Sequence, residues 1–163
     1  MAASIFDLTK SQLSYYTIPA AMVLLYVPHT YAQLASGRKN LNNAYPRTTD
    51  ENVVKDETMD KRTKNRILRA RAAHANGNET IGLYAAAVVA ANVAGADVKS
   101  VNYLTLGYIA SRVAYNYIYV IAQDNSRWAP LRTVVWTTGL GIIFTLFVKA
   151  GNAAANVSTL RLS

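Results

Sequence analysis

Seven polar residues lie within or next to apolar, helix-forming segments of this sequence and could support chemistry. In chain order they are Arg69, Asn76, Glu79, Arg112, Tyr115, Tyr119 and Arg132. Spacings of three, four or seven place the first three on one face of a helix, and the next three on one face of a later helix. Ionisable groups are costly at the edge of a membrane, so this pattern is typical of a functional site.

The types of these residues suit a small hydrophilic ligand that carries several charges. In antiparallel helices, Asn76 and Glu79 would lie level with Tyr119, and Arg132 would lie at the same level. Guanidinium groups bind carboxylates through paired hydrogen bonds, and a carboxylate can hold an ammonium group. An arginine or a tyrosine hydroxyl beside a sulfur favours the thiolate over the thiol. Two carboxylates, one ammonium and one thiol are the groups of glutathione, which we therefore expect as the ligand.

Each of these residues also has a purely structural interpretation. Glu79 could form an ion pair with Arg112, and Asn76 could simply bridge helices through hydrogen bonds. Tyr119 is one of several tyrosines on its helix, and Arg132 could be only a determinant of membrane topology. The sequence leaves both interpretations open.

Long stretches without charge predict an all-α membrane protein. No Asp, Glu, Lys or Arg occurs within residues 11–37, 80–96 or 133–148, and residues 101–122 contain one basic residue, Arg112. A helix of about 20 residues crosses the hydrocarbon core of a bilayer. We therefore expect one domain, residues 1–163, that forms a bundle of four transmembrane helices at about 13–35, 62–94, 100–123 and 129–150.

The distribution of charge favours a lipid bilayer as partner and argues against nucleic acid. The net charge is +8, but the basic residues between Arg38 and Arg71 are mixed with acidic ones. They also lack the interleaved aromatic side chains on which bases stack. By the positive-inside rule, the loop over residues 37–60 is predicted to be cytosolic.

The composition does not favour a metal centre. The sequence has no cysteine and only two histidines, His29 and His74, too few for an expected transition-metal site. His74 lies off the helix face that Asn76 and Glu79 share, and it is predicted to be a surface or headgroup residue.

Three motifs, in this order along the chain, resemble those of one family. They are the basic segment Arg66–Glu79 followed by an apolar helix, the pattern Arg112-Val-Ala-x-x-x-x-Tyr119, and Pro130-Leu-Arg132-Thr. Together they resemble the MAPEG family, the membrane-associated proteins in eicosanoid and glutathione metabolism. The likeness covers roughly residues 60–148, and the four-helix layout extends it to the first helix.

The resemblance implies a homotrimer of four-helix bundles in the endoplasmic reticulum membrane, with glutathione bound between subunits. The implied activity is glutathione-dependent conjugation, peroxide reduction or isomerisation of a lipophilic substrate. By the same resemblance, Arg132 and Tyr119 are the catalytic residues. The residues implied to bind glutathione are Arg69, Asn76, Glu79, Arg112 and Tyr115.

The chain also departs from the family pattern. Members usually carry an arginine four residues before the asparagine, where this chain has Ala72. Arg69 shares the helix face and is the expected replacement. The usual proline three residues after the glutamate is Gly82 here. An alternative function is therefore that of a non-enzymatic, lipid-binding family member that presents substrate to a partner enzyme.

Overall fold

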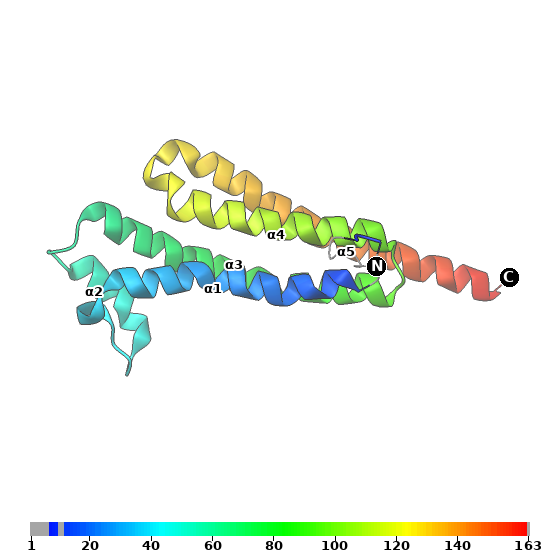
Figure 1. The fold of residues 1–163 in the computed structure, drawn as a ribbon, viewed down its shortest axis with the longest axis horizontal. Helices are drawn as coiled ribbons and strands as arrows, with labels where there is room; N and C mark the ends of the chain where they lie inside the picture. Colours follow the sequence, from blue (N-terminus) through cyan, green and yellow to red (C-terminus); the bar gives the residue numbers. More distant parts are fainter. Residues whose placement is uncertain (1–6, 10–11, 163) are drawn as a thin grey trace.

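The fold is all-α, as expected from the sequence. The structure is a computed structural model that describes residues 7–9 and 12–162 (Figure 1). Within those residues there are five α-helices and no strand. The α-helices are α1 (Thr17–Ser36), α2 (Thr49–Lys55), α3 (Lys61–Val93), α4 (Val98–Val120) and α5 (Ala129–Leu162). Short 3-10 turns are found at Leu13–Tyr16, Arg38–Asn40, Pro46–Thr48, Ala122–Asp124 and Ser126–Trp128.

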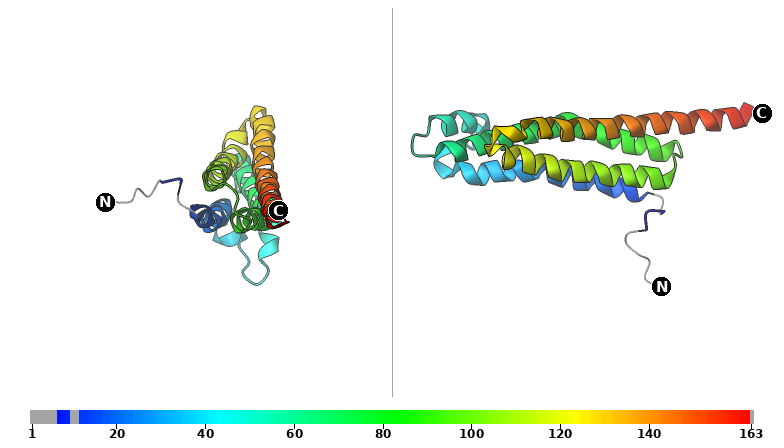
Figure 2. Two further views of the ribbon diagram at one scale, coloured as in Figure 1. Left: turned by 90° about the vertical axis from the view of Figure 1, so that its right-hand side faces the viewer. Right: turned by 90° about the horizontal axis from the view of Figure 1, so that it is seen from above.

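The four long helices form an elongated bundle. α3 packs against α1, α4 and α5, and α4 also packs against α1 and α5. α2 and the loop around it lie at one end of the bundle, and α5 extends past the other helices at the opposite end (Figures 1 and 2). The α4–α5 connection, residues 121–128, lies at the same end as α2 (Figure 1).

The long helices lie close to the predicted segments, with two differences. α5 continues to Leu162, past the predicted end at about residue 150. The predicted loop 37–60 contains the short helix α2, whose buried Val53 anchors it to the bundle. By length and hydropathy, one segment among the described residues, Ser126–Asn156, is long and apolar enough to cross a membrane. The count of four spans stays a prediction.

Local capping explains where α3 and α4 begin. The carboxylate of Asp60 accepts a hydrogen bond from the backbone N–H of Thr63 at 3.0 Å. Asp97 accepts one from the N–H of Ser100 at 2.8 Å. Such caps satisfy backbone donors that have no partner within the helix. Gly95, with φ of +73°, lets the chain turn between α3 and α4.

Two apolar clusters hold the bundle together. The larger lies along α3, α4 and α5, where the buried rings of Tyr84 and Tyr108 stack with centroids 3.8 Å apart. The second lies nearer α2 and contains Val53, Ile67 and Tyr115. The second cluster packs directly beside the polar residues singled out from the sequence, so it fixes their positions.

Candidate functional site

The first contact of the candidate site joins α3 to α4. The side-chain amide of Asn76 donates a hydrogen bond to the hydroxyl of Tyr115 at 2.6 Å. Tyr115 is buried, and Asn76 is half-buried. A buried hydroxyl needs such a partner, because an unpaired one would cost free energy. The pair therefore fixes the register of the two helices at the site.

Aromatic contacts continue this series from α4 to α5. The rings of Tyr115 and Tyr119 lie 5.5 Å apart between centroids, at an interplanar angle of 60°. The guanidinium carbon of Arg132 lies 4.8 Å from the centroid of the Tyr119 ring. A cation above a ring face is attracted by the negative face of the π-system. Arg132 and Tyr119 are both half-buried, so they lie at the edge of the bundle.

Arg112 is more deeply buried than Arg132 and Tyr119, and it lies against the ring of Tyr115. Its guanidinium carbon is 5.1 Å from the ring centroid of Tyr115 and 5.2 Å from that of Tyr108. The residue is only 7% exposed, and its Nε and Nη2 atoms have no hydrogen-bond partner in the described part of the chain. A small cavity of about 20 Å³ lies beside it, also lined by Gly77 and Asn116. That volume is enough for about one water molecule and far too small for a tripeptide.

A glycine on α5 makes room for this arginine. A Cβ atom at Gly139 would clash with the guanidinium group of Arg112 and touch the hydroxyl of Ser111. Gly139 is itself buried. The absence of a side chain at this position therefore lets α5 approach α4 at the level of the buried cation.

Comparison with known proteins assigns the family. A model of the MAPEG family matches residues 16–152, which is most of the chain. The chain belongs to the MAPEG family. No curated protein and no solved structure matches it. The MAPEG family consists of membrane-associated helical bundles and includes glutathione-dependent enzymes together with other members.

Five of the seven predicted residues come together in this MAPEG chain. They form one continuous set of contacts that spans α3, α4 and α5: Asn76, Arg112, Tyr115, Tyr119 and Arg132. We name this set the Tyr115–Arg132 series. The structural alternative of an ion pair between Glu79 and Arg112 is wrong, since Arg112 contacts tyrosine rings and no carboxylate within the described residues.

Glu79 does not join the series. It lies one helical turn after Asn76, but its side chain is exposed and makes no hydrogen bond or ion pair with other described residues. His74, predicted at the surface, is instead half-buried, and its ring nitrogens contact the carbonyl of Leu25 and the amide of Asn78 at 3.0 Å. Spacing along a helix predicts which residues share a face, but it does not predict how deeply each side chain is buried.

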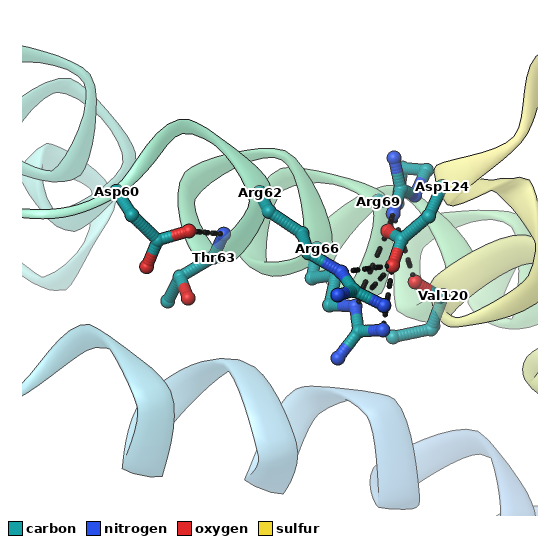
Figure 3. Close-up of polar contacts among 7 residues, drawn as sticks. All are labelled: Asp60, Arg62, Thr63, Arg66, Arg69, Val120 and Asp124. Carbon is teal, nitrogen blue, oxygen red and sulfur yellow. Dashed lines mark hydrogen bonds and ion pairs between the residues drawn. The ribbon is translucent and has the colours of Figure 1, made fainter.

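Arg69 does not join the Tyr115–Arg132 series either, because its side chain binds Asp124. Its Nη2 atom donates to the carboxylate of Asp124 at 2.5 Å and to the carbonyl of Val120 at 3.0 Å (Figure 3). Arg62 and Arg66 bind the same carboxylate at 2.6 Å and 2.5 Å. We name these three arginines with Asp124 the Asp124 cluster. Hydrogen bonds from Arg66 above all, and from Arg62 and Arg69, hold the pKa of Asp124 far below its ordinary value.

Three residues of the site were not identified from the sequence. Tyr108 lies beside Arg112, Gly139 makes room for it, and Asp124 binds Arg69. Tyr108 precedes Arg112 by one helical turn, so the spacing alone could have suggested the contact. Asp124 is the only acidic residue after Asp97, and the arginines at 62, 66 and 69 share a helix face that needed a counter-charge.

Proposed function

We propose that this MAPEG protein is a glutathione-dependent membrane enzyme that acts on lipophilic substrates by conjugation, peroxide reduction or isomerisation. Within the proposal it resides in the endoplasmic reticulum membrane as a homotrimer, with the loop 37–60 in the cytosol. The observation that carries the proposal is the Tyr115–Arg132 series, in which three helices of a MAPEG chain bring a guanidinium group, two tyrosines and an amide into contact.

The residues present fit glutathione by charge and by position. Arg132 and Tyr119 are half-buried at the edge of the bundle, and Glu79 is exposed, so each can reach a ligand on the outer face. The cavity beside Arg112 cannot hold the tripeptide. A carboxylate without a partner among the described residues, such as Glu79, agrees with a ligand that lies between subunits.

When bound, glutathione would supply a thiolate that acts as nucleophile or reductant. The guanidinium group of Arg132 would stabilise negative charge on the sulfur and so lower the pKa of the thiol. Tyr119 holds that guanidinium group through its ring face. Asn76 and Glu79 would hold the peptide groups of the ligand, and Arg112 acts as a positioning residue beneath the ring of Tyr115.

The test is thiolate formation in an Arg132→Ala variant. We expect the ultraviolet difference absorbance of the thiolate, seen when glutathione is added to the wild type, to be lost in R132A. Arg127→Ala is the matched control, because Arg127 is an exposed arginine in the α4–α5 connection whose side chain makes no hydrogen bond or ion pair with the described residues. An undiminished thiolate signal in R132A would remove Arg132 from the mechanism.

A second candidate function is lipid binding without catalysis. Two observations favour it: Ala72 replaces an arginine that the family usually carries, and an apolar groove lies between α1 and α4. The groove has a volume of about 270 Å³ and is lined by residues such as Leu24, Val27 and Val113. Calorimetry with glutathione, followed by turnover of a generic electrophile, separates the two. Binding with turnover supports the enzyme, and binding without turnover supports the lipid-presenting protein.

A further inference from the structure

The Asp124 cluster contains more positive charge than its single carboxylate can neutralise. Three guanidinium groups converge on Asp124 (Figure 3). Lys61 lines the same surface hollow as Arg62, Arg69 and Asp124. Ion pairing therefore leaves an excess of positive charge at this end of the bundle.

Several donors of the cluster remain available. Arg62 binds Asp124 through Nε, and its side chain is 68% exposed. Its two terminal nitrogens make no hydrogen bond with the described residues. The Nε atom of Arg69 also has no hydrogen-bond partner in the described chain, but it is buried and so does not face a ligand at the surface. A guanidinium group offers five N–H donors, and each of these arginines uses only part of them.

The exposed side chain of Arg62 borders a hollow in the surface. The hollow has a volume of about 450 Å³ and is lined by Lys61, Arg62, Asn65, Arg69 and Asp124. Every residue of the lining is polar or charged, and Asn65 adds an amide to the cationic groups. We name it the basic hollow. Its chemistry suits a compact anion that can accept several hydrogen bonds.

The position of the basic hollow indicates where that anion would come from. The apolar segment Ser126–Asn156 begins two residues after Asp124. If that helix crosses a bilayer, the basic hollow lies at the level of the lipid headgroups. Basic clusters next to a membrane helix attract anionic lipids, because the phosphate groups there are held at high local concentration.

We propose that the basic hollow binds the phosphate group of an anionic lipid headgroup at the bilayer surface. The planar fork of Arg62 matches two phosphate oxygens, and Lys61 adds a flexible point charge. Arg66 and Asp124 hold the arginines in place. The site is distinct from the Tyr115–Arg132 series and does not rest on the proposed function.

The test measures binding of phosphatidic acid, a phosphate monoester lipid, to the purified full chain in phosphatidylcholine mixed micelles. We expect wild type to bind a fluorescent phosphatidic acid at least about tenfold more tightly than the matching phosphatidylcholine. The double variant K61Q/R62Q should lose about tenfold in affinity. It keeps the Arg66 and Arg69 ion pairs to Asp124, and its thermal unfolding in micelles verifies that it folds.

The matched control is R38Q/R47Q. Both arginines are exposed and belong to the connection between α1 and α3. Their side chains make no hydrogen bond or ion pair with the described residues. This variant removes the same charge outside the basic hollow, so its affinity should stay within about twofold of wild type. An equal loss in both variants, or equal binding of the two lipids by wild type, would overturn the proposal.

Two competitors identify the source of the phosphate. Displacement of the lipid by glycerol 3-phosphate supports a phosphate site open to soluble monoesters as well, and failure to displace supports a headgroup site that needs the lipid chains. Glutathione should not displace the lipid. Displacement by glutathione would place the basic hollow within the glutathione site and overturn its separate assignment.

Discussion

Arg112 is a buried cation whose neighbours are aromatic rings. The two nearest groups are the ring faces of Tyr108 and Tyr115, at about equal distances from the guanidinium carbon. Ring faces stabilise a cation most when water is excluded, by roughly 2 kcal/mol. This contribution is smaller than the cost of burying a charge, so the packing around Arg112 must hold it firmly in place.

At the scale of single residues, the close approach of Gly139 to Arg112 leads to a prediction. A Gly139→Ala substitution would force the guanidinium group to move, because the added methyl group overlaps it. We expect a loss of about 1–3 kcal/mol in the free energy of unfolding, the usual range for overpacking. Thermal unfolding in detergent micelles measures it.

The control for G139A lies on the same helix. A Cβ atom at Gly141 would meet nothing within 4 Å, and the residue is exposed. Gly141→Ala should be neutral or slightly stabilising, because alanine favours a helix over glycine by up to about 1 kcal/mol. If both variants unfolded at the same temperature, the contact between α5 and Arg112 would not limit packing.

At the scale of helices, the Asp124 cluster ties the beginning of α3 to the end of α4. Arg62, Arg66 and Arg69 lie on one face of α3, and Asp124 lies in the α4–α5 connection. The side chain of Asp124 is 19% exposed, so solvent screens these ion pairs only in part. The first turns of α3 carry few apolar groups, so this polar contact largely fixes their position.

Replacing Asp124 by asparagine tests that role. We expect Asp124→Asn to lower the free energy of unfolding at pH 7 by about 1–3 kcal/mol, since charged hydrogen bonds are lost and the arginines repel one another. The pKa of Asp124 is lowered in the fold by the arginines. Its stabilisation is therefore fully present above the ordinary Asp pKa of about 3.9 and is lost as the pH falls below that value.

The difference in the free energy of unfolding between wild type and D124N should depend on pH. Chemical unfolding at pH 7 and at a pH of about 3 measures this difference. The free energy of unfolding of wild type should come closer to that of the variant at the lower pH. Glu57→Gln is the control, because Glu57 is an exposed carboxylate in the 37–60 loop that makes no hydrogen bond or ion pair with the described residues. A gap between wild type and D124N that stayed constant over this range would show that ionisation of Asp124 does not stabilise the fold.

The sequence predicted helices better than contacts. Charge-free stretches located α1 and most of α5, and a stretch with the single arginine Arg112 located α4. Such stretches are long enough to cross a bilayer as helices. Arg69 was predicted to share a face of α3 with Asn76 and Glu79, but its side chain binds Asp124 in the α4–α5 connection. Spacing within α3 could not reveal a partner from another part of the chain. Likewise, spacing alone could not show that Arg112 is buried against rings while Glu79 is exposed.

At the scale of the whole molecule, several polar side chains lie in the core, and many large apolar side chains are exposed on the outside of the bundle. On α4, Asn102 and Thr105 are buried, with relative exposures of 1% and 0%. On α5, Val134, Phe144 and Val148 are each at least 59% exposed. This arrangement would be unfavourable in water but suits lipid, where apolar side chains face the hydrocarbon and polar ones pair inside the bundle.

If the chain crosses the membrane four times, the α1–α3 connection and the α4–α5 connection lie on one side of the bilayer. The α3–α4 turn then lies on the other side. Because the chain has no cysteine, single Asn43→Cys, Arg127→Cys and Lys99→Cys variants each present one thiol, at positions that are exposed. In sealed vesicles, an impermeant maleimide should label N43C and R127C from the same side and K99C only from the other. Detergent permeabilisation, which exposes all three, is the control. Labelling of N43C and K99C from one side would mean that α3 does not cross, and the long cationic start of α3 would then lie along the membrane surface.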